Sequence, residues 1–205
     1  MDPSCMRLGI DLDNTIVSYD ELFADLAVQR GMLRRAPTGS KRAVCDAVRG
    51  GPGEAAWQAL QAEVYGPAMS RAKPFDGVAD FVRAAREKGI DVRIISHKTR
   101  RAAAAPDGCD LHEAALRWLD EQGFFAEGGL RPEYVRFLPT RADKLEAIAA
   151  SGCTHFIDDL VEVLGDPAFP ADVARYLFAP AGACANKPYK VCQSWRELSD
   201  ELLAA

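Results

Sequence analysis

The chain has 205 residues, of which 48% are hydrophobic and 27% charged, and its formal net charge is −5. This length and apolar content indicate one compact domain with room for a small insert, and they exclude disorder as the main description. The acidic balance argues against a protein that coats nucleic acid, because such a protein needs a basic surface.

The first twenty residues include Asp2, Arg7, Asp11 and Asp13, which leaves no place for the apolar centre of a signal peptide. No stretch without charged residues approaches the ~20 residues that span a bilayer. We therefore expect a soluble, cytoplasmic protein without membrane association. The cysteines form no C-x-x-C pair and the histidines have no zinc spacing, so free thiols and no structural zinc are expected. The cysteines are Cys5, Cys45, Cys109, Cys153, Cys184 and Cys192.

Five short apolar runs are predicted to be buried strands, because they are rich in Ile, Val, Leu, Phe and Tyr and are bounded by charged or turn residues. They are Arg7–Leu12, Asp91–Ile95, Tyr134–Leu138, Thr154–Ile157 and Arg175–Phe178. Helices are predicted between and after them, at 76–88, 110–122, 140–150 and from Ser194 onward. The last three begin with capping-box spacing, as in Thr140 and Asp143. This alternation predicts an α/β fold, a three-layer Rossmann-like parallel sheet.

The segment after the first strand is far longer than an ordinary βα loop of about 2–6 residues. It has helical patterns at 19–33, 41–49 and 54–65, so we predict a small helical cap over Val17–Lys73. The remaining residues, 1–16 and 74–205, are assigned to the α/β core. Basic side chains of the cap are usually solvated but are candidates for gripping an anionic substrate. These are Arg30, Arg34, Arg35, Lys41 and Arg42.

Polar side chains are concentrated where the predicted strands end, which is where open parallel sheets bind ligands. The sequences there are Asp11-Leu12-Asp13-Asn14-Thr15, Ser96-His97-Lys98 and Asp158-Asp159, and Lys144 lies on the helix after the third strand. Converging carboxylates without His or Cys suit Mg²⁺, and Mg²⁺ with a lysine and a hydroxyl suits a phosphoryl group. One carboxylate can then act as nucleophile, and a second can exchange protons with the leaving oxygen and with water.

In order and context, these segments resemble the four motifs of the haloacid dehalogenase superfamily of phosphatases. The resemblance implies that Asp11 is the nucleophile and a Mg²⁺ ligand, and that Asp13 is the general acid/base with its backbone carbonyl on the metal. It also implies that Ser96 and Lys144 bind the phosphoryl oxygens, and that Asp158 ligates Mg²⁺ with support from Asp159. Thr15, His97 and Lys98 are further candidates for binding the substrate.

The resulting expectation is a Mg²⁺-dependent phosphatase acting on a small phosphorylated metabolite, such as a sugar phosphate or a nucleotide, through an aspartyl-phosphate. A phosphotransferase or mutase would share the first step. Asp13 disfavours a dehalogenase, which protonates no ester oxygen, and a non-catalytic domain would be expected to lack Asp11 or Lys144. His97 is equally well explained as a structural histidine, and Glu162 as a solvated helix residue. The sequence predicts no oligomeric state.

Overall fold

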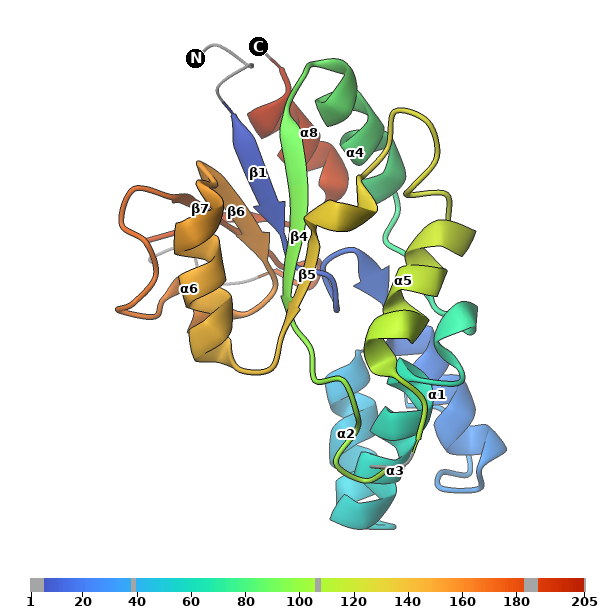
Figure 1. Cartoon of the computed structure of the whole chain (residues 1–205). Coiled ribbons are helices and arrows are strands. Elements are labelled where there is room, and N and C mark those ends of the chain that lie inside the picture. The colour runs from blue at the N-terminus through green and yellow to red at the C-terminus, as the bar shows by residue number, and fades with distance from the viewer. Residues whose placement is uncertain (1–5, 38–39, 106–107, 183–187, 205) are drawn as a thin grey trace. The chain divides into compact units, whose positions relative to one another are not determined.

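The computed structural model describes residues 6–37, 40–105, 108–182 and 188–204 (Figure 1). Its contacts divide the chain into two compact units. The α/β unit consists of Met1–Val17, Pro74–Lys98 and Gln122–Ala205, and the helical unit of Ser18–Lys73 and Thr99–Glu121. Each unit is described by itself below.

The α/β unit is built on a six-stranded sheet in the order β5-β4-β1-β6-β7-β8, and every neighbouring pair is parallel. The predicted α/β class is therefore confirmed, and all five predicted strands are present within a residue or two of their expected ends. The sixth strand, β8, was not predicted. The strands are β1 (Arg7–Ile10), β4 (Asp91–His97), β5 (Val135–Leu138), β6 (His155–Asp158), β7 (Ala174–Phe178) and β8 (Lys190–Cys192).

Helices cover both faces of this sheet, because successive strand residues point to opposite sides. Leu177 of β7 packs in a core cluster with Leu145 and Ile148 of α6 and with Val163 of α7. Its neighbour Phe178 lies on the opposite face, against a tryptophan of α8. The unit therefore has three layers. Its helices are α4 (Val78–Glu87), α6 (Arg141–Ser151), α7 (Val161–Leu164), α8 (Trp195–Leu202) and the short 3₁₀ helix η3 (Pro132–Tyr134).

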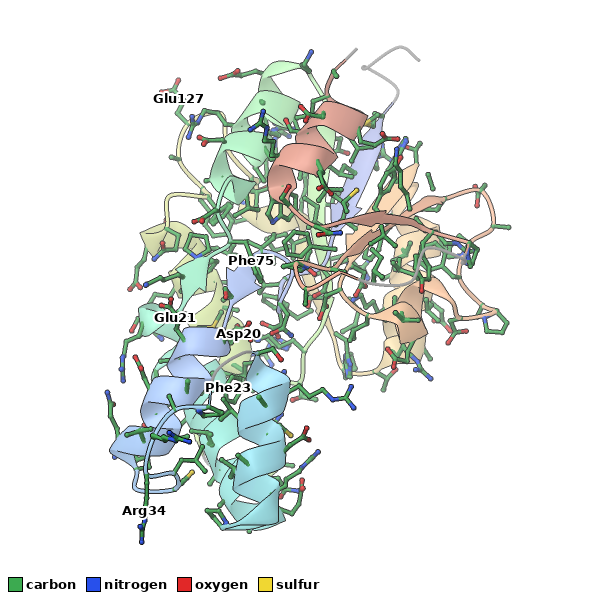
Figure 2. All side chains as sticks on the ribbon, turned by 180° about the vertical axis from the view of Figure 1, so that it is seen from behind. Asp20, Glu21, Phe23, Arg34, Phe75 and Glu127 are labelled. Carbon is green, nitrogen blue, oxygen red and sulfur yellow. The ribbon has the colours of Figure 1, made fainter. Side chains whose placement is uncertain are left out.

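The helical unit has a core of aromatic side chains. The Phe23 ring stacks on Trp57 with centroids 5.0 Å apart and meets Tyr65 edge-on at 5.7 Å. Figure 2 shows Phe23 among these helices and Arg34 extending away from them. The elements are α1 (Asp20–Gln29), α2 (Lys41–Gly50), α3 (Glu54–Tyr65), η2 (Met69–Arg71) and α5 (Leu111–Glu121). Two short strands, β2 (Val17–Ser18) and β3 (Lys73–Pro74), pair where the chain passes between the units.

One helix lies in a different unit from the one the sequence indicated. The sequence assigned 110–122 to the α/β core, whereas α5 packs with η2 and α3 in the helical unit. Its buried residues include Leu111, Trp118 and Leu119, and the Trp118 indole donates a hydrogen bond of 2.9 Å to the backbone carbonyl of Ala72. Apolar periodicity predicted the helix correctly, but it does not say which partner covers the apolar face.

In the described residues, no helix is long and apolar enough to cross a membrane. Cys45, Cys109, Cys153 and Cys192 have free thiols. Cys5 and Cys184 lie outside the described residues.

Candidate functional site

Strand pairing brings Asp11 beside Asp158. The register of β1 and β6 aligns Ile10 with Ile157, and the Asp11 amide continues the ladder by donating to the Ile157 carbonyl at 2.9 Å. Asp158 is the next residue of β6 and Asp159 follows it. Each of the three aspartates offers a carboxylate oxygen within 4.8 Å of the others, and Asp11 and Asp158 are buried.

Lys144 enters this cluster of three aspartates from the first turn of α6. Thr140 begins that helix by accepting a hydrogen bond of 3.1 Å from the Asp143 amide, as the predicted capping box requires. The Lys144 ammonium lies 2.5 Å from Asp11 Oδ1 and 2.6 Å from Asp158 Oδ2, and its side chain is 1% exposed. The lysine is therefore a fixed internal cation and not a solvated residue of the helix surface.

The surroundings of Asp11 shift its proton affinity strongly. Burial raises the pKa of the Asp11 carboxyl, the Lys144 cation opposes this effect, and the Asp158 charge adds to it, giving a pKa of about 7. Burial lowers the pKa of Lys144, but the charges of Asp11 and Asp158 outweigh burial and raise it above the ordinary value. Lys144 thus stays protonated, while Asp11 changes charge near neutral pH.

The composition of the site fits a hard cation bound beside an oxyanion. The three aspartates present only oxygen ligands, as Mg²⁺ and similar ions prefer, and could together hold a metal ion. At the end of β4, the Ser96 hydroxyl is buried and has no hydrogen-bond partner within the described part of the chain. A buried polar group of this kind calls for a partner from outside the protein, such as a ligand oxygen or a water molecule.

Asp13 stands apart from the three-aspartate cluster. Its carboxylate accepts two hydrogen bonds from Lys98, at 2.9 Å to Oδ1 and 2.7 Å to Oδ2. The turn after it is tight: Asn14 has a left-handed φ of 61°, and its amide donates to the Val17 carbonyl. The structure therefore joins two predicted site residues, Asp13 and Lys98, in one ion pair.

The other predicted site residues have local partners of their own. Thr15 is buried, with its hydroxyl 3.5 Å from Asp159 Oδ1. His97 is exposed, and its Nε2 lies 3.0 Å from the carbonyl oxygen of Pro139. Glu162 is exposed on α7, in agreement with its solvated interpretation. Substrate contact by Thr15, His97 and Lys98 stays a prediction.

Two contacts at the site had not been predicted. The Trp195 indole of α8 donates a hydrogen bond of 3.2 Å to the Thr15 carbonyl, which ties the loop after β1 to this helix. Asp158 Oδ1 accepts from the Leu160 amide at 3.0 Å and so fixes the turn after β6. A helical tryptophan in the sequence predicts burial only, and nothing in its spacing identifies Thr15 as its partner.

Solved structures with the same fold include haloacid dehalogenase-type hydrolases. One from Deinococcus radiodurans, with bound phosphate and sodium, is 18% identical, has a TM-score of 0.60 and covers 100% of this chain and 97% of its own. Bacillus subtilis YfnB, bound to magnesium, is 14% identical with a TM-score of 0.56, covering 97% and 98%. A protein described as a dehalogenase is 12% identical with a TM-score of 0.57, covering 98% and 97%.

No protein-family model matches the chain, and a search of curated proteins finds no relative. The structural likeness shows that the chain has the haloacid dehalogenase fold.

Proposed function

We propose that this protein is a Mg²⁺-dependent phosphatase that hydrolyses the phosphate monoester of a small metabolite, such as a sugar phosphate or a nucleotide. The observation that carries the proposal is the buried Asp11 carboxylate, held between the Lys144 cation and Asp158 at the carboxyl ends of the central strands. The magnesium and the phosphate in two structural neighbours support it, as ligands of those proteins.

In the first half of the reaction, an Asp11 oxygen attacks the phosphorus and the bond from phosphorus to the ester oxygen breaks. A proton from Asp13 goes to the leaving oxygen, so an alcohol departs and Asp11 carries the phosphoryl group. In the second half, Asp13 takes a proton from a water molecule that attacks the same phosphorus. The bond from phosphorus to Asp11 then breaks, which frees inorganic phosphate.

Electrostatic stabilisation of the phosphoryl oxygens is the largest contribution expected from the remaining residues. The Ser96 hydroxyl, which needs a hydrogen-bond partner, would donate to one of these oxygens, and Lys144 would balance their charge. Asp11, Asp158, Asp159 and the Asp13 carbonyl would hold Mg²⁺. The bound ion would neutralise part of the negative charge that builds up on the transferred group.

Asp13 also favours the phosphatase over a dehalogenase. A departing halide needs no proton, whereas an ester oxygen does. A dehalogenase therefore has no use for the acid/base group that we assign to Asp13.

The test is phosphate release from a panel of sugar phosphates, nucleotides and aryl phosphates, with Mg²⁺ and with EDTA. We expect EDTA to abolish turnover and Asp11→Asn to abolish both turnover and the acid-stable phosphorylation of the protein. Asp80→Asn is the matched control, because Asp80 is an exposed aspartate of α4 paired only with a surface arginine in the described contacts. Turnover that survives EDTA or Asp11→Asn would refute the mechanism, and phosphate appearing on an added alcohol would identify a phosphotransferase.

A further inference from the structure

Three residues are predicted to bind the substrate. Among the described contacts, Lys98 alone of the three makes an ion pair with a proposed catalytic carboxylate, that of Asp13. Its side chain is 3% exposed, and its ammonium lies within 2.9 Å of both oxygens of Asp13. An ammonium placed across both carboxylate oxygens fixes the rotation of that carboxylate, because any turn about the side chain lengthens one of the two bonds.

The position of Lys98 follows from the sheet. The Lys98 amide donates to the Leu138 carbonyl at 2.9 Å, so β4 stays paired with β5 one residue beyond its last assigned strand residue. Side chains two residues apart on a strand share a face, which places Lys98 on the face of Ser96 and opposite to His97. The backbone that carries the ammonium is therefore held in place by hydrogen bonding between β4 and β5.

We propose that Lys98 is a positioning residue for Asp13 and does not bind the substrate. This inference rests on the proposed function, in which Asp13 exchanges protons with the leaving group and with water. The two hydrogen bonds from one ammonium hold the Asp13 carboxylate at a single rotation about its side chain. Lys98 thus holds Asp13 ready for the second half-reaction, in which Asp13 takes the proton of the attacking water as the bond from phosphorus to Asp11 breaks.

A positioning role and a substrate-binding role predict different kinetics. If Lys98 acts through Asp13, its loss slows hydrolysis of the aspartyl-phosphate and leaves substrate affinity nearly unchanged. Formation of that intermediate from an ester with a good leaving group survives, because a nitrophenolate departs without a proton. If Lys98 instead bound the substrate, its loss would raise KM and suppress the first half-reaction as well.

The experiment compares Lys98→Met, Asp13→Asn and the double variant, with Mg²⁺ present and with 4-nitrophenyl phosphate and phenyl phosphate as matched esters. We expect Lys98→Met to lower steady-state turnover by about 10²-fold, the usual cost of a misplaced catalytic group. A burst of one nitrophenolate per enzyme is expected, and KM should not rise, because an intermediate that accumulates lowers KM together with kcat. Phenyl phosphate, with its poorer leaving group, should lose the burst.

The double variant is the decisive measurement. Residues that work as a unit are not additive, so Lys98→Met should cause no further loss in the Asp13→Asn protein. The proposal is overturned if the losses of the two single variants multiply in the double variant. It is also overturned if Lys98→Met raises KM or leaves the rate unchanged. Wild-type protein that forms no aspartyl-phosphate would instead overturn the proposed function together with this inference.

A variant in a second lysine–carboxylate pair of the α/β unit serves as the control for loss of folding. Lys190 makes an ion pair with Glu201 at the surface, so Lys190→Met also removes a lysine from a carboxylate. Lys190→Met should leave the steady-state turnover, the nitrophenolate burst and KM unchanged. If Lys98→Met loses the nitrophenolate burst and unfolds at a lower temperature than Lys190→Met, Lys98 is merely structural and the proposal is wrong.

Discussion

At the residue scale, the main feature is a carboxyl group whose charge depends on its neighbours. Asp11 is buried with a pKa of about 7, against an ordinary value of 3.8. Between these two values the folded protein holds a proton that the unfolded chain has released. At mildly acidic pH the Asp11–Lys144 pair of the metal-free protein therefore has a net positive charge, whereas two ionised side chains would sum to zero.

This shift predicts how the stability of the metal-free protein depends on pH. Because the folded-state pKa lies above the unfolded one, Asp11 contributes stability that is fully present below about pH 4 and is lost as the pH rises through about 7. The loss is on the order of a few kcal/mol. Chemical unfolding of wild type and Asp11→Asn in EDTA, from pH 4.5 to 8, measures it. The advantage of the wild type over the variant should shrink with rising pH, and a constant difference would contradict the assignment.

Mg²⁺ provides the complementary measurement. A metal ligand must be deprotonated, so binding becomes tighter as Asp11 ionises. The rise in unfolding temperature on adding Mg²⁺ should be larger at pH 8 than at pH 5.5, and it should be nearly absent in Asp11→Asn. An equal rise at both pH values would remove Asp11 from the metal ligands.

At the element scale, α6 matters because its first turn carries the buried lysine. The Thr140 hydroxyl lies 2.6 Å from Asp143 Oδ2 and accepts from the Asp143 amide, one residue before Lys144. This cap orders the backbone that aims the ammonium at Asp11. A disturbance of the cap is therefore expected to affect both the helix and the site.

Thr140→Ala should lower the free energy of unfolding by about 1 kcal/mol, the usual cost of losing a side-chain cap. Thr140→Ser keeps the hydroxyl and should stay within a few tenths of a kcal/mol of the wild type. Urea unfolding of the three proteins separates these outcomes. Equal losses in the two variants would show that the methyl group, and not the hydroxyl, stabilises this helix end.

At the scale of the whole molecule, the helical unit is discontinuous in sequence. Its second segment, Thr99–Glu121, leaves the α/β unit directly after Lys98 and includes α5. The apolar face of α5 is covered within the helical unit, as the hydrogen bond from Trp118 to Ala72 illustrates. Neither segment can be removed alone without exposing the apolar surface of the other.

Deletion variants test this division. Replacing residues 18–73 by a short Gly-Ser linker should uncover α5 and cause aggregation, because large exposed apolar patches promote association. Replacing both 18–73 and 99–121 should yield a monodisperse α/β unit. Size-exclusion chromatography and circular dichroism compare the two products. Equal behaviour of both would show that α5 does not depend on the inserted helices.

The sequence predicted those features that have local causes. Apolar runs identified the strands, and capping-box spacing identified the start of α6 at Thr140. The strand β8 was missed because its three residues, Lys190–Cys192, form too short a run to show a period. The assignment of α5 to a unit, the support of Thr15 by Trp195 and the pairing of Lys98 with Asp13 depend on tertiary packing, which no local pattern encodes.

The order of strands in the sheet also has a consequence for synthesis of the protein. The first strand of this sheet in sequence, β1, is central, between β4 and β6. The Arg7 amide donates to Thr154 Oγ1, 147 residues along the chain. The Thr15 carbonyl, in the loop after β1, accepts from the Trp195 indole, 180 residues along the chain. Pairing over such separations makes folding slow. During synthesis Asp11 therefore emerges long before Lys144 and Asp158, and the site cannot assemble until those later residues are available.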